Sequence, residues 1–86
     1  MRYDTDHKQQ TRERVLREAA KAIRAEGPHQ IAVAGIMAKA GLTHGGFYAH
    51  FASKDDLIVA YLERRAQWER DAIAQVRQVA ADVPDA

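Results

Sequence analysis

The chain has 86 residues, of which 47% are hydrophobic and none is cysteine, and its formal net charge is +1. This length allows one small domain, and without cysteine the chain can form neither a disulfide bond nor a thiolate metal site. No apolar run approaches the ~20 residues of a membrane span, and the polar first ten residues do not resemble a signal peptide. We therefore expect a cytoplasmic protein without a membrane partner.

The charges are unevenly distributed along the chain. Residues 1–54 carry nine Lys or Arg and five acids, a net charge of +4, whereas residues 55–86 carry four bases and seven acids, a net charge of −3. A basic half is what binding to phosphate groups requires. Chance asymmetry in a small chain is the alternative interpretation.

The pattern of apolar residues predicts an all-α fold, because β-branched residues are sparse and never alternate over a useful length. Residues 1–6 are expected to form a frayed tail, followed by a first helix from about His7 to Glu26. Asp6 and Gln9 are a candidate capping box at its start. Gly27 and the proline after it are a stop signal. The inward stripe of this helix is Val15, Leu16, Ala19, Ala20 and Ile23.

Residues 33–54 have the pattern of a helix-turn-helix, a motif that places its second helix in the DNA major groove. A short helix is expected from Val33 to Ala40, a turn at residues 40–42, and another short helix over residues 43–51. Thr43 is its predicted N-cap. Apolar residues fall where the two crossing helices need them: Ile36, Ala40, Leu42, Phe47 and Phe51.

Two adjacent glycines, Gly45 and Gly46, lie in the second of these short helices, where they weaken helix propensity. Such a pair suits a place that another backbone must approach closely. That backbone is either a DNA strand or the first helix, and the sequence leaves both alternatives open.

A long fourth helix is expected to begin after Ser53, with Asp56 as its capping partner, and to continue to about Ala80. Its first apolar residues should complete the core: Leu57, Ile58, Tyr61 and Leu62. A second apolar stripe follows, for which this chain offers no cover: Trp68, Ala72, Ile73, Val76 and Val79. An uncovered stripe predicts a partner, either another domain or another subunit.

The stretch AGLTHGGFYAHFASKDDL, residues 40–57, resembles the signature Ala-Gly-Val-Ser…Tyr-x-x-Phe-x-x-Lys-x-x-Leu of TetR-family transcriptional regulators. The similarity covers roughly residues 11–62. It implies a DNA-binding domain at residues 1–62, a connecting helix over residues 63–86, and a further carboxy-terminal domain for homodimerisation and a small-molecule effector. We accordingly expect a homodimeric repressor, of which this chain is a fragment.

The resemblance also implies the residues that contact double-stranded DNA: Ala32, Val33, Ala34, Thr43, His44, Gly45, Gly46, Tyr48, His50 and Lys54. Tyr48 and Lys54 should hold phosphates, and His50 should lie on the DNA side. For Tyr48, the alternative is a core ring with only its hydroxyl at the surface. A two-fold dimer should read a palindromic operator.

The residue inventory argues against an enzyme, because there is no thiol, no glycine-rich phosphate loop and no assembled Ser/His/Asp set. We expect no cofactor and no metal site, since His44 and His50 face different sides of a helix. The first helix has a basic face formed by Arg14, Arg17, Lys21 and Arg24, and such a face is usually solvated. The alternative interpretation is that Arg12 or Arg14 contacts DNA. The rival function is a helical protein-interaction module that docks a partner through the Trp68–Val79 stripe.

Overall fold

The computed structural model describes the backbone of residues 2–83 and the side chains of residues 5–83. Its helical elements, in chain order, are α1 (Arg2–Glu26), α2 (Val33–Lys39), the 3-10 helix η1 (His44–Ala49) and α3 (Lys54–Asp82). This part of the chain contains no strand, so the predicted all-α class is confirmed.

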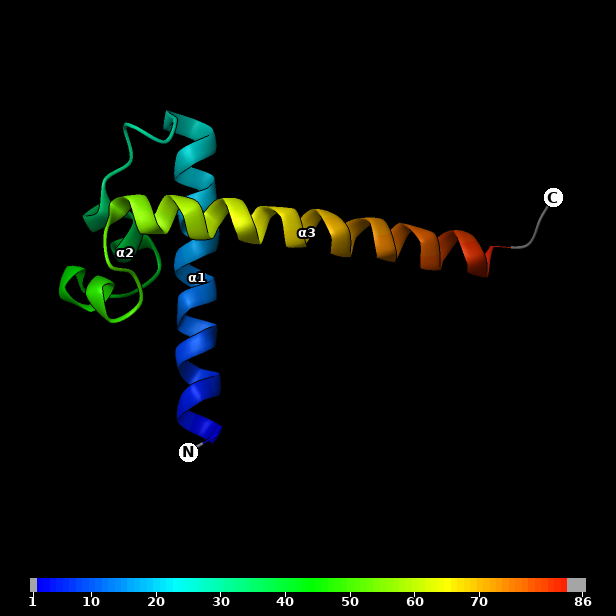
Figure 1. Cartoon of the computed structure of the whole chain (residues 1–86), viewed down its shortest axis with the longest axis horizontal. Helices are drawn as coiled ribbons and strands as arrows, with labels where there is room; N and C mark the ends of the chain where they lie inside the picture. The colour runs from blue at the N-terminus through cyan, green and yellow to red at the C-terminus, as the bar shows by residue number, and fades with distance from the viewer. Residues whose placement is uncertain (1, 84–86) are drawn as a thin grey trace.

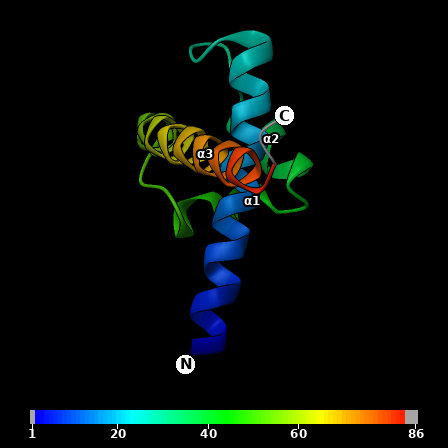
Figure 2. The same ribbon diagram turned by 90° about the vertical axis from the view of Figure 1, so that its right-hand side faces the viewer.

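The two long helices, α1 and α3, cross each other, and α2 and η1 lie on one side of the crossing (Figure 1). α1 packs against both α2 and α3, while α2 packs against η1. Figure 1 shows the far end of α3 projecting away from α1, and in Figure 2, turned by 90°, α3 is seen nearly along its axis. The molecule is therefore elongated, with extents of 55 × 37 × 19 Å.

α1 begins at Arg2 rather than near His7, so the predicted frayed tail is wrong for residues 2–6. Residue 1 lies outside the described residues. No glycine or proline occurs before Gly27, so no residue of this stretch stops the helix from extending beyond its apolar stripe. Asp6 and Gln9 consequently lie within α1 instead of capping its start.

Two glycines with positive φ end the first two helices, as predicted. Gly27 has a φ of +84° and donates its N–H to the Ile23 carbonyl at 2.8 Å, which closes α1. Gly41 has a φ of +77° in the turn between α2 and η1. A side chain at either position would be strained, because only glycine adopts this conformation at little cost.

One buried cluster joins all the helical elements. Its largest fully buried side chains are Phe47, Leu16, Met37, Leu57 and Val15. The predicted inward stripe of α1 is confirmed, with Ile23 partly buried at its edge. Leu62 was expected in the core but is 52% exposed, because Leu57, Ala60 and Tyr61 occupy the face of α3 that meets α1.

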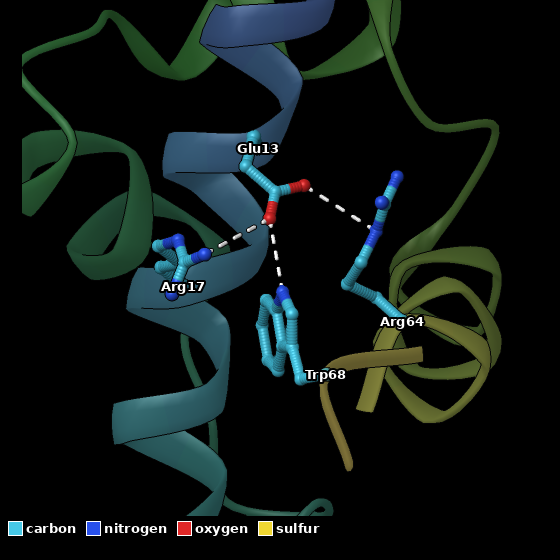
Figure 3. A network of polar contacts seen from close by, with 4 residues as sticks. All are labelled: Glu13, Arg17, Arg64 and Trp68. Atoms are coloured by element: carbon cyan, nitrogen blue, oxygen red, sulfur yellow. Dashed lines mark hydrogen bonds and ion pairs between the residues drawn. The ribbon is translucent and has the colours of Figure 1, made fainter. Parts of the chain in front are cut away.

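Trp68 does not belong to an uncovered stripe, which corrects the sequence prediction. Its ring packs against the core cluster, and its indole N–H donates to Glu13 of α1 at 3.1 Å. The same carboxylate forms ion pairs with Arg17 at 3.5 Å and with Arg64 at 3.3 Å (Figure 3). The sequence pattern missed this contact because Glu13 lies far away in the chain.

The start of α3 has the predicted capping box. The Ser53 hydroxyl accepts a hydrogen bond from the Asp56 N–H at 3.0 Å, and the Asp56 carboxylate accepts one from the Ala52 N–H at 3.0 Å. These bonds satisfy backbone donors that a helix start leaves free. Over residues 2–83, no helix combines the length and the apolar character that crossing a membrane requires.

Candidate nucleic-acid interface

The segment expected as a recognition helix is a single 3-10 helix, η1, rather than an α-helix over residues 43–51. The Gly46 N–H donates to the Thr43 carbonyl at 3.1 Å, and the His50 N–H donates to the Phe47 carbonyl at 3.0 Å. Such i to i+3 bonds are usual in short helical pieces, and two glycines in six residues disfavour a longer α-helix.

Thr43 occupies the N-cap position of η1, but its side chain makes no capping hydrogen bond, so its predicted capping role is wrong. Its backbone is extended, with a φ of −83° and a ψ of 152°. Thr43 and His44 are both exposed. Their side chains are therefore accessible at the start of η1.

Phe47 fixes the orientation of η1. Its side chain is 1% exposed and stacks against Phe51, with ring centroids 5.5 Å apart. Tyr48, the next residue, meets the Phe47 ring edge-on at 5.2 Å yet is 69% exposed. The interpretation of Tyr48 as a core ring is therefore wrong, and η1 presents its tyrosine outward.

The glycine pair is not required for packing within the chain. A Cβ placed on Gly45 would meet no atom within 4 Å, and one on Gly46 would make ordinary contacts with Thr43 at 3.6 Å and Met37 at 3.9 Å. Neither residue lies against α1, so the close-packing alternative is wrong. Packing within the described part of the chain therefore does not explain why these two residues are glycines.

The start of α2 and the start of α3 flank this region. Ala32 and Ala34 are exposed and Val33 is half-buried, with Ala32 in an extended conformation just before α2. Lys54, the first residue of α3, donates from its ammonium group to the His29 carbonyl at 3.4 Å. The charge of Lys54 thus lies beside the loop that leads into α2.

His50 lies between η1 and the amino-terminal half of α1. Its Nδ1 atom is buried, with no hydrogen-bond partner in the described part of the chain. Burial of the ring, and then the positive charges of Lys8 and Arg12, hold the pKa of His50 below its ordinary value of 6.5. The Arg12 guanidinium also stacks over the Phe51 ring at 4.8 Å.

These neighbours place basic residues of α1 beside the end of η1. Sequence reasoning did not select Lys8, because nothing in its local pattern links it to His50. Arg14, the other arginine considered, donates instead to the Ala40 carbonyl at 2.8 Å. This bond ties α1 to the carbonyl that ends α2.

The family model of bacterial regulatory proteins of the tetR family matches residues 15–61. The matched range begins at the first core residue of α1 and includes all of α2, η1 and the turn between them. The chain belongs to the TetR family. It is accordingly a DNA-binding transcription regulator. No curated protein and no solved structure matches the chain.

The TetR match includes all ten residues that the sequence predicted as DNA contacts, since these lie between residues 32 and 54. Lys8, Arg12 and Trp68 lie outside it. The contacts of these three residues with the helix-turn-helix and with α1 therefore involve residues that the family match does not cover.

Proposed function

We propose that this TetR-family chain represses transcription as a homodimer whose two η1 segments bind the half-sites of a palindromic operator. The contact surface comprises Ala32, Val33, Ala34, Thr43, His44, Gly45, Gly46, Tyr48, His50 and Lys54. A small-molecule effector, bound by a carboxy-terminal domain outside this chain, releases the operator.

The exposure of Tyr48 is the observation that carries this proposal. A tyrosine that is 69% exposed, next to a phenylalanine that is 1% exposed, has its ring position fixed by packing and its hydroxyl available. Side chains of this kind position a protein on DNA through hydrogen bonds to phosphate oxygens. Tyr48 and Lys54 thus supply affinity in the proposal.

Few side chains on this surface read base edges well. Thr43 and His44 are exposed polar candidates, whereas η1 has no arginine for guanine and no amide for adenine. Ala34 can contact a thymine methyl group. One chain should therefore discriminate modestly between sequences, and two-fold pairing on a palindrome supplies the remaining specificity.

The test begins with duplexes selected from a random pool, followed by anisotropy titrations over a range of salt concentrations. Tyr48→Phe removes one hydroxyl and should weaken binding about tenfold without changing the salt dependence. Lys54→Gln removes one phosphate contact and should weaken binding while reducing the slope of log K against log salt by about 1.

Arg77→Gln is the matched control for Lys54→Gln, because it also removes one positive charge but from the exposed far end of α3. It should leave both affinity and salt slope unchanged. Equal affinities for Tyr48→Phe, Lys54→Gln and the parent chain would contradict the proposed surface. Circular dichroism melts establish that each variant remains folded.

The glycines provide a second test of the same surface. Gly45→Ala meets no neighbouring atom within the chain, so the fold should be unaffected or slightly more stable. The added methyl group should nevertheless weaken duplex binding if a DNA backbone approaches there. Unchanged affinity would show that η1 does not come close to the duplex at Gly45.

A docking module is the second candidate function, favoured by one observation. Ile73, Val76 and Val79 are 53%, 67% and 59% exposed on the projecting end of α3. Trp68 is not available to such a surface, because it packs on α1. Apolar docking would be nearly insensitive to salt, whereas duplex binding weakens steeply as salt rises.

A further inference from the structure

A basic groove crosses α1 between the end of α2 and the middle of α3. The cavity has a volume of about 400 Å³, and five cationic side chains line it: Arg14, Arg17, Lys21, Arg24 and Lys39. Glu18 is the acid among the lining residues. The groove shares no residue with the ten predicted DNA contacts, so it is a separate surface of the molecule.

The positive charge of this groove is only partly balanced. Lys21 pairs with Glu18 at 3.0 Å, and Arg17 pairs with Glu13 at 3.5 Å. Arg24 and Lys39 form no ion pair or side-chain hydrogen bond within residues 5–83 that would offset their charge. Two exposed cations, Arg24 of α1 and Lys39 of α2, are therefore available to an anion that enters the groove.

The floor of the groove is apolar. Ala20 and Ala40 are 2% and 8% exposed, and the half-buried Trp68 closes the third side. Arg17 covers the indole ring at 4.9 Å, while the indole N–H is held by Glu13, which fixes the ring in place (Figure 3). A neighbouring cavity of about 410 Å³ shares Arg24 and Trp68, so the apolar surface continues beside the groove.

We propose that this groove binds a small organic anion that joins a phosphate or carboxylate group to an aromatic or aliphatic body. The volume lies within the range of small-molecule sites, about 300–1,000 Å³, which combine apolar walls with a few charged groups. A bare inorganic anion or a nucleic-acid backbone would use the cations but would leave the alanine and tryptophan floor unused. The cations of the groove suit the charged group of such a ligand, and the apolar surface suits its aromatic or aliphatic body.

Trp68 is the one tryptophan of the sequence, so its fluorescence reports directly on the groove. Phenyl phosphate is the probe, and inorganic phosphate and phenol supply its charged and apolar halves separately. Phenyl phosphate should change the Trp68 emission saturably in the millimolar range. Phosphate alone should bind about tenfold more weakly, because it lacks the apolar contact, and phenol should produce no saturable change.

Arg24→Gln and Lys39→Gln locate the site, because both side chains are exposed and their loss should not affect folding. Each should weaken phenyl phosphate binding about tenfold, as expected when a charge-assisted hydrogen bond is lost. Arg77→Gln again serves as the control and should bind like the parent chain. Circular dichroism compares the helix content of all three variants.

Three results would overturn this proposal. They are equal affinities for phenyl phosphate and inorganic phosphate, an equal loss in the control variant, and the absence of any saturable change in Trp68 emission. Weakened duplex binding by Arg24→Gln and Lys39→Gln without phenyl phosphate binding would instead assign the groove to nucleic acid. The Tyr48 and Lys54 titrations test operator binding separately, so failure here leaves the proposed function standing.

Discussion

The two halves of α3 belong to one uninterrupted helix but have different surroundings. Residues 54–68 bury Leu57, Ala60 and Tyr61 against α1 and end with Trp68 on the core cluster. Every residue from 69 to 83 is exposed, including the apolar Val76 at 67%. Both halves carry apolar residues at helical spacing, and among the side chains of residues 5–83 only the first half has a packing partner.

This difference shows that apolar periodicity predicts a helix without predicting what the helix packs against. The second half is supported by local interactions, such as the Arg65–Glu69 pair at 3.1 Å and the Gln67–Asp71 bond at 2.8 Å. Pairs of this kind contribute only ~0.2–0.5 kcal/mol each to a helix. The packed half should therefore determine the free energy of unfolding, and the projecting half should open first.

Leu57→Ala should produce the largest loss. Leu57 is fully buried, and removing its side chain should lower the free energy of unfolding by about 3 kcal/mol. Val76→Ala, the same kind of truncation in the projecting half, should change it by less than ~0.5 kcal/mol. Urea unfolding followed by circular dichroism compares the two variants, and similar losses would show that both halves are packed.

The Glu13–Trp68 hydrogen bond lies at the boundary between the packed and the projecting half of α3, and mutating its two residues tests whether Trp68 belongs to the packed half. Glu13→Ala removes the acceptor shared by Trp68, Arg17 and Arg64, and should cost about 2 kcal/mol. Trp68→Phe removes the indole N–H and should cost less. A double-mutant cycle should give a coupling energy of at least ~0.5 kcal/mol, whereas additive losses would place Trp68 with the projecting half.

The start of the packed half depends on its cap. Ser53→Ala removes the hydroxyl that accepts from the Asp56 N–H, so it should lower the free energy of unfolding by about 1 kcal/mol. Ser53→Asp keeps an acceptor oxygen at this position and should retain most of the stability. Thermal melts of the two variants provide the comparison, and equal melting temperatures would contradict a capping role.

The smallest expected effect is a pH dependence of the free energy of unfolding. It arises from His50 in the packed part of the molecule, since residues 69–83 contain no histidine. Burial, Lys8 and Arg12 lower the pKa of His50 in the folded chain, so below pH 6.5 the unfolded chain binds a proton that the folded chain does not. The His50 contribution is therefore constant well above pH 6.5 and becomes destabilising as the pH falls through that value.

His50→Asn should remove this contribution and reduce the acid sensitivity of unfolding. Urea midpoints measured at about pH 7.5 and about pH 5.5 give the comparison between parent and variant. An identical decrease in both proteins would mean that His50 titrates equally in the folded and unfolded chains. Val76→Ala should show the acid sensitivity of the parent.

Local signals made much of this fold predictable from sequence. Gly27, Gly41 and Ser53 act within a few residues of their own positions, and the turn and cap that they predict are present in the structure. The TetR signature lies in the same short-range region. The site residues on η1 were selected from the resemblance to this signature, whose residues lie close together in the sequence.

The predictions that failed depend on contacts distant in sequence or on small energy differences. Trp68 donates a hydrogen bond to Glu13 of α1, which lies far away in the sequence. Leu62 faces away from the core although it adjoins the buried Tyr61. The sequence prediction of a helix over residues 43–51 did not distinguish a 3-10 helix from an α-helix, a choice that depends on small energy differences around the two glycines of η1. The early start of α1 has no apolar pattern to reveal it, and four of the five residues 2–6 have modest helix propensity.

The hydrogen bond from Arg14 to the Ala40 carbonyl links α1 to the end of α2, immediately before the turn of the helix-turn-helix. It holds α1 at 2.8 Å to the residue immediately before the left-handed Gly41, so it joins α1 to the turn that leads into η1. In the proposed dimer, half-sites lie about 34 Å apart, one helical turn of DNA. Because a two-fold dimer would contain this bond twice, we expect the fit of its two η1 segments to an operator to depend on Arg14.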